Sequence, residues 1–200
     1  VGDFVELPQR YEKHKFCIRG VLEKPNLAKS ISTFEIQAAG FNLSPSDECN
    51  NEAMINCVNT PTNVGTFLDE AFISVDGAFS RDLDDLVFAT KSEEGFNLKV
   101  AIADVSRFVP VGSKVDNYAK KQMTSIYCPG FTSTMLPSVI SHDICSLLPG
   151  PIKNTLVADI NLDKEGNILN YHFFEAETRS SQKFTYNRVQ ELKEGALPTL

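Results

Sequence analysis

Four aspartates lie within one ten-residue stretch, residues 76–85, and an apolar run stands on either side of it. Residues 71–75 precede the stretch and residues 86–89 follow it. Both runs have the length and composition of β-strands. The carboxylates are therefore predicted to lie in a loop held between two strands. This constrains the fold strongly, because the two strands must anchor a loop that carries so much negative charge.

Carboxylates packed this closely repel one another and raise each other's pKa unless a cation lies among them. Oxygen ligands without a thiol or an imidazole nearby suit Mg²⁺ or Mn²⁺. Metal ions held by several aspartates are a common means of attacking a phosphodiester. The alternative is a solvated acidic loop, which the flanking strands make less favourable because they hold the loop rigidly.

The spacing of the aspartates also limits how they can meet. Asp82 and Asp84 point to the same side of an extended chain, while Asp85 points to the other side. A metal cage therefore needs a turn in the backbone, and Gly77 offers conformational freedom beside Asp76. A calcium-binding helix-loop-helix and an aspartyl-phosphate phosphatase motif both fail to match this stretch.

Local patterns predict an α+β fold, a mixed sheet with packed helices. Alternating apolar residues predict strands at residues 3–7, 16–22 and 33–39, two hairpins at 85–104 and 156–178, and a strand before the aspartates. Helices are predicted at residues 47–57, 113–126, 137–145 and 185–194, and Ser113 and Thr185 are the expected N-caps of the second and fourth.

Composition excludes several classes of protein. The 200 residues suffice for one domain or parts of two, and the apolar fraction of 42% permits a core. The sequence contains no run of 18 apolar residues, so it predicts no membrane span. The five cysteines form no Cys-x-x-Cys pair, which favours free thiols in a reducing cytoplasm. The net charge of −7 argues against a nonspecific nucleic-acid binder unless the acidic residues build a metal site and basic surface lies elsewhere.

An ordered set of motifs follows the aspartates. The segments are Val100–Ser106, Gly112–Asp116, Ser125–Gly130, Met135–Pro137, Cys145–Gly150, Thr178–Ser180 and Phe184–Tyr186. In this order and spacing the chain resembles the N-terminal part of the catalytic (RNB) domain of the ribonuclease II and ribonuclease R family. The resemblance is strong from Phe72 to Leu192. It implies the end of a cold-shock-like β domain, a barrel remnant, at residues 1–40, a linker at 41–70, and an incomplete catalytic domain at 71–200.

The resemblance implies roles for particular side chains. All four aspartates would belong to the catalytic site, with Mg²⁺ or Mn²⁺ bound by Asp76, Asp82 and Asp85, and with Asp84 as the fourth carboxylate.

Two tyrosines receive roles from the resemblance, and Asp104 is a further candidate beside the aspartates. Tyr127 and Tyr186 would contact RNA near its 3′ end by stacking on bases, and the alternative for each is a half-buried tyrosine with a bonded hydroxyl. Asp104 is expected to support the aspartates from nearby, and its alternative is a turn former at the end of a strand.

The family implies hydrolytic, processive 3′-to-5′ degradation of single-stranded RNA to nucleoside 5′-monophosphates with two divalent ions. RNA would be the partner, in the cytoplasm, and nothing in the sequence indicates a protein partner or a membrane. The family's downstream catalytic arginine and C-terminal RNA-binding barrel have no counterpart here, so the chain is expected to be a fragment with weak activity or none. Two alternatives stay open: a catalytically inactive RNA-binding relative or scaffold, and a phosphoesterase acting on a small molecule.

Overall fold

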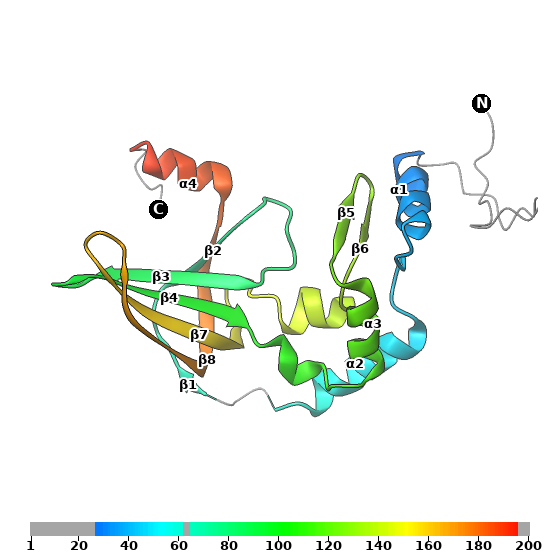
Figure 1. The fold of residues 1–200 in the computed structure, drawn as a ribbon, viewed down its shortest axis with the longest axis horizontal. Helices are drawn as coiled ribbons and strands as arrows, with labels where there is room; N and C mark the ends of the chain where they lie inside the picture. The colour runs from blue at the N-terminus through cyan, green and yellow to red at the C-terminus, as the bar shows by residue number, and fades with distance from the viewer. Residues whose placement is uncertain (1–26, 62–64, 196–200) are drawn as a thin grey trace, which may run out of the picture. The chain divides into compact units, whose positions relative to one another are not determined.

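The computed structural model describes residues 27–61 and 65–195, which belong to two compact units (Figure 1). The first unit contains the described residues up to Glu52 together with Pro110–Pro137. The second contains the described residues of 53–109 and those from Ser138 onward. Both helices and strands are present, which confirms the expected α+β class.

The first unit is built from helices and one short hairpin. Its elements are α1 (Leu27–Ala38), the first part of α2 (Asp47–Asn59), α3 (Lys114–Gln122), β5 (Ile126–Cys128) and β6 (Phe131–Ser133). The hydroxyl of Ser113 accepts a hydrogen bond from the backbone N–H of Asp116, so the predicted cap of α3 is confirmed.

Two predictions in this unit were wrong. Residues 33–39 were expected to form a strand, yet all but the last lie in α1. The helix that begins after Ser113 was expected to reach Ile126, but it ends at Gln122, because Met123 adopts a left-handed backbone conformation with φ 57°. Ile126 instead begins β5.

A buried glutamine joins three segments of the first unit. The side chain of Gln122 is fully buried, and its Nε2 donates to the Ser133 hydroxyl at 2.7 Å and to the Asn42 carbonyl at 3.2 Å. Its Oε1 accepts from the Asn42 backbone N–H at 3.1 Å. Every polar atom of this amide group is therefore bonded, which fixes the end of α3 against β6.

The second unit centres on a six-stranded mixed sheet in the order β1-β8-β2-β3-β4-β7, in which β7 also pairs with β8. The strands are β1 (Thr66–Phe67), β2 (Phe72–Asp76), β3 (Asp85–Lys91), β4 (Gly95–Ala103), β7 (Ile152–Asp163) and β8 (Ile168–Thr185). The long β8 pairs with β7 through residues 168–179 and with β2 through residues 180–185, so the sheet closes on itself.

Both predicted hairpins of the second unit are confirmed, β3–β4 and β7–β8, and the strands of the second are longer than expected. Gly95 begins β4 directly against β7, where a Cβ atom would lie 2.2 Å from the Leu162 carbonyl oxygen. Only glycine fits there without moving the backbone.

One face of this sheet forms the core of the unit. Leu86, Ala101 and Val157 are register neighbours on adjacent strands, and each is at most 1% exposed. Burial of each large apolar side chain contributes about 1.5–3 kcal/mol to the free energy of unfolding. This face therefore holds β3, which carries Asp85, together with β4 and β7.

Besides the end of α2, the second unit contains three short helices: the 3₁₀-helix η1 (Val105–Phe108), the π-helix η2 (Val139–Ile144) and α4 (Tyr186–Lys193). Thr185 caps α4 by accepting from the backbone N–H of Arg188, as predicted. The helix predicted at residues 137–145 covers only residues 139–144, and it is a π-helix, which is wider than an α-helix.

Some predictions concern residues outside the described ranges. The strands expected at 3–7 and 16–22 and most of the expected barrel remnant fall there, as does Cys17. The other cysteines, Cys49, Cys57, Cys128 and Cys145, are free thiols. No helix in the described part of the chain is long and apolar enough to cross a membrane.

Candidate active site

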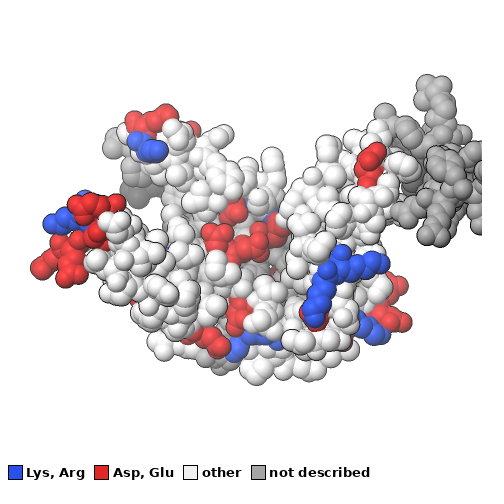
Figure 2. All heavy atoms as spheres, viewed as in Figure 1, with Lys and Arg blue, Asp and Glu red and all other residues white. Residues whose placement is uncertain are grey.

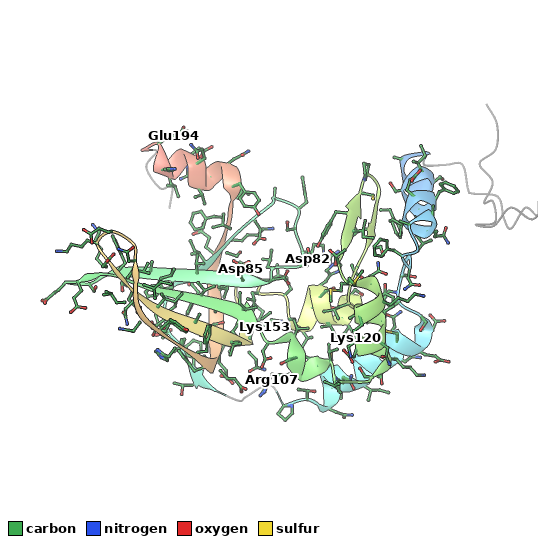
Figure 3. The ribbon with its side chains drawn as sticks, viewed as in Figure 1. Asp82, Asp85, Arg107, Lys120, Lys153 and Glu194 are labelled. Carbon is green, nitrogen blue, oxygen red and sulfur yellow. The ribbon has the colours of Figure 1, made fainter. Side chains whose placement is uncertain are left out.

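The four aspartates, called here the aspartate cluster, lie at the ends of two neighbouring strands and in the loop between them. Asp76 is the last residue of β2 and Asp85 the first of β3, while Asp82 and Asp84 belong to the connecting residues 77–84, the acidic loop. Figure 3 shows Asp82 and Asp85 on this part of the second unit. The predicted arrangement of a loop between two strands is confirmed, since β2 and β3 pair antiparallel.

The middle of the acidic loop is anchored by a buried side chain and by backbone hydrogen bonds. Leu83 is fully buried. Its N–H donates to the Ser146 hydroxyl at 3.3 Å, and its carbonyl accepts from the Leu147 N–H at 2.9 Å. The Ser146 hydroxyl in turn donates to the Arg81 carbonyl at 2.6 Å. The backbone between Asp82 and Asp84 is therefore held in one position.

Both ends of the loop are also held. The Asp84 carbonyl accepts from the Ala103 N–H at 2.9 Å. At the other end, the Lys183 ammonium group donates to the Ser80 carbonyl at 2.8 Å and to the Ala78 carbonyl at 3.4 Å. Gly77, expected to supply conformational freedom, is not among the glycines with a positive φ. A Cβ atom there would lie 3.0 Å from the Ser80 hydroxyl, so its small size has the clearer role.

The carboxylates of the cluster repel one another. Partial burial raises the pKa of Asp84, and the three other aspartates raise it further, Asp82 most. Burial also raises the pKa of Asp76, with Asp85 next, while the positive charge of Lys183 opposes the shift. Figure 2 shows acidic side chains gathered where the loop joins β2 and β3. Such a concentration of negative charge attracts cations.

The chemistry of the ligands fits a hard divalent ion. Carboxylate oxygens are the ligands that Mg²⁺ and Mn²⁺ prefer. In the described part of the chain, however, no three His, Cys, Asp or Glu side chains are arranged closely enough to hold an ion. The backbone thus brings the four carboxylates into one region, and their side chains would have to approach one another to bind a metal.

The two predicted RNA-contacting tyrosines lie in different units. Tyr186 is the first residue of α4 and is 64% exposed. It follows Thr185, the register partner of Asp76 in the parallel β2–β8 pair, so it lies at the same end of the sheet as the cluster. Tyr127 lies in β5 of the first unit and is 65% exposed. Neither tyrosine belongs to the core, and contact of either one with RNA stays a prediction.

Asp104, predicted to support the cluster, lies just after β4 and has partners of its own. It accepts from the Ser106 hydroxyl at 2.7 Å and lies 3.3 Å from the Arg107 guanidinium. Burial raises the pKa of the Cys145 thiol to about 12, and Asp104 and Asp84 both add to this shift. The two carboxylates therefore act on a common buried group, but the contacts of Asp104 fit the turn-forming alternative equally well.

Sequence reasoning missed two residues that hold the loop, Ser146 and Lys183. Ser146 lies inside the motif Cys145–Gly150, so the ordered motifs offered a signal for it. Lys183 lies between two motifs and offered none.

Comparison with known proteins places this chain in a family. The RNB domain matches residues 66–197. Ribonuclease R of Buchnera aphidicola subsp. Schizaphis graminum is 38% identical over 127 residues, which cover 62% of this chain and 18% of that relative. The chain thus spans less than a fifth of that relative's length.

Solved structures agree with the sequence comparison. Ribonuclease R of Mycoplasma genitalium, in complex with ribose-methylated single-stranded RNA, matches with a TM-score of 0.81 and 27% identity over 92% of this chain and 30% of that one. Yeast Ssd1, a pseudonuclease, matches with a TM-score of 0.66 over 99% of this chain and 26% of that one. At 15% identity this second match shows a shared fold alone.

Proposed function

This chain belongs to the RNB-domain family, and from that membership we propose that it supplies the metal-binding part of a 3′-to-5′ exoribonuclease. The substrate is single-stranded RNA, hydrolysed processively to nucleoside 5′-monophosphates. The relative named ribonuclease R and the solved relative bound to single-stranded RNA support this assignment.

The proposed cofactor is Mg²⁺, with Mn²⁺ as a substitute. Asp76, Asp82 and Asp85 hold the ions, and Asp84 is the fourth carboxylate. Two divalent ions bound there would activate the attacking water and stabilise the negative charge on the oxygen that leaves. The hydrogen bonds that hold the backbone of the acidic loop keep Asp82 and Asp84 in the same region as Asp76 and Asp85, so only side chains would have to move for an ion to bind.

The exposed tyrosines position the RNA. Tyr186 and Tyr127 present ring faces that can stack on bases without reading their identity. Stacking of this kind suits a nuclease that degrades any sequence. Holding the last nucleotides in line with the aspartate cluster contributes to the rate through orientation.

One observation carries the proposal: a chain that matches the RNB domain gathers four aspartates in and beside a loop that is anchored by Leu83, Ser146 and Lys183. Burial raises the pKa of Asp76 and of Asp84, and repulsion from neighbouring aspartates raises it further; a bound divalent cation would relieve that repulsion.

Calorimetric titration of the 200-residue chain with Mn²⁺ tests metal binding. We expect binding that Asp76→Asn and Asp85→Asn each weaken, because each change removes a ligand charge. Asp163→Asn is the matched control, since Asp163 is the last residue of β7, outside the aspartate cluster, and accepts from the N–H groups of Glu165 and Asn167. Equal affinity in the wild type and both cluster variants would contradict the metal assignment.

Hydrolysis of RNA is tested in the complete protein. The Asp84→Asn change should abolish the release of mononucleotides from a labelled single strand while RNA binding persists, because the loss of negative charge near phosphates does not oppose binding. Near-normal turnover in this variant would count against the role of the cluster.

The second candidate is a catalytically inactive RNA-binding relative. Two observations support this candidate: the fold is shared with a pseudonuclease, and no three carboxylates of the described residues lie close enough together to hold an ion. RNA binding without hydrolysis at any Mg²⁺ or Mn²⁺ concentration would support this reading.

A further inference from the structure

Lys183 lies on β8 beside the start of the acidic loop. The parallel register pairs it with Ser74 of β2, two residues before the pairing of Thr185 with Asp76. Its ammonium group reaches across to two loop carbonyls, those of Ser80 at 2.8 Å and Ala78 at 3.4 Å. The bond to Ser80 joins residues 103 positions apart in the chain.

The charge of Lys183 makes this position informative. A cation beside a metal site repels the incoming ion, since like charges raise the energy of the bound state. By charge alone, a lysine so close to Asp76 disfavours metal binding. Its geometry offers a compensating effect, because charge-assisted hydrogen bonds to two carbonyls hold the loop that carries Asp82 and Asp84.

We propose that Lys183 is a positioning residue, whose ammonium group clamps the carbonyls of Ala78 and Ser80 and so fixes the acidic loop for metal binding. The inference rests on the proposed function of the same site. It assigns Lys183 no contact with the reacting atoms. The clamp works from one end of the loop, while Ser146 and Leu147 hold its middle.

Lys153 provides a matched control within the same unit. Its ammonium group also donates to two backbone carbonyls, those of Asp143 at 2.6 Å and Ile144 at 3.1 Å. It is not among the charges that act on Asp76 or Asp84. The Lys153→Met change therefore removes the same kind of contact from a different segment.

Titration with Mn²⁺ separates positioning from charge. If Lys183 acts through its charge alone, Lys183→Met binds Mn²⁺ more tightly than the wild type. If it positions the loop, Lys183→Met binds about 10- to 100-fold more weakly, which is typical for the loss of a group that orients metal ligands. Lys183→Arg should restore most of the affinity, and Lys153→Met should stay within about twofold of the wild type on the same reasoning.

Amide hydrogen exchange of the metal-free chain gives a readout that needs no ion. We expect faster exchange of the Leu83 amide and its loop neighbours in Lys183→Met than in the wild type or Lys153→Met. Unchanged exchange, or Mn²⁺ affinity equal to or above that of the wild type, would overturn the proposal.

Two further outcomes remain decisive. A wild type that binds no Mn²⁺ would sink the proposed metal site, while exchange would still decide whether Lys183 clamps the loop. If Lys183→Met does not fold, by circular dichroism, Lys183→Gln takes its place, because glutamine can donate to one carbonyl without the charge. Intermediate exchange protection in that variant would support the clamp, and full protection would refute it.

Discussion

The Leu83→Ala change tests whether the acidic loop is part of the folded core. Leu83 is 0% exposed, although both of its neighbours in the sequence are polar. Removing a fully buried leucine side chain costs about 2–5 kcal/mol, the sum of lost transfer free energy and the cavity left behind. We expect a loss of about 3 kcal/mol or more, because no part of this side chain is exposed and the backbone hydrogen bonds to residues 146 and 147 limit collapse of the cavity.

The free energy of unfolding is measured by urea titration of the 200-residue chain, followed by far-ultraviolet circular dichroism. Leu169→Ala is the control, since Leu169 is 48% exposed on β8 and its truncation should cost about 1 kcal/mol or less. A loss under about 1 kcal/mol for Leu83→Ala would refute the reasoning, because it would show that the loop packs too loosely to gain from this side chain. Weaker Mn²⁺ binding in the folded variant would connect the packing to the proposed site.

Two more predictions concern charge and stacking. The pKa of Asp84 is raised in the fold, so ionisation of Asp84 destabilises the protein. This penalty is absent below the ordinary pKa of 3.8, grows as the pH rises from there to the raised pKa, and is complete above it. Asp84→Asn should therefore raise the free energy of unfolding of the metal-free chain at pH 7, and this gain should disappear in acid. Equal urea midpoints of variant and wild type at pH 7 would contradict a destabilising charge on Asp84. Tyr127→Ala should weaken RNA binding about 5- to 150-fold or change the length of the smallest product, because a stacked base is worth about 1–3 kcal/mol, while Tyr127→Phe keeps the ring and should be mild. Unchanged affinity and product length in a folded Tyr127→Ala chain would exclude the contact.

The sequence by itself determined the elements whose signals are local. The cap residues Ser113 and Thr185 act within one helical turn, and both begin helices as predicted. Alternating apolar residues predicted both hairpins, because side-chain alternation alone sets which face of a strand is buried. The position of the aspartates between β2 and β3 followed from the same patterns.

Local patterns failed at two helices of the first unit, and at one of them a distant partner holds the helix end. Residues 33–38 have a composition that permits a strand, yet they form part of α1. The helix after Ser113 stopped at Gln122, whose buried amide group bonds to Asn42 and Ser133. An apolar periodicity cannot reveal such an end, because the hydrogen bonds between Gln122 and Asn42 join residues 80 positions apart.

The candidate site divides in the same way. Its carboxylates were evident from the sequence, since aspartate carries its chemistry in the side chain. What holds them in place was decided by the tertiary structure: the acceptors that Lys183 and Ser146 find are backbone carbonyls. Every residue has such a carbonyl, so the sequence gives no sign of which one a distant lysine or serine will reach. Only the pairing of β8 with β2 and the burial of Leu83 bring these groups within hydrogen-bond distance.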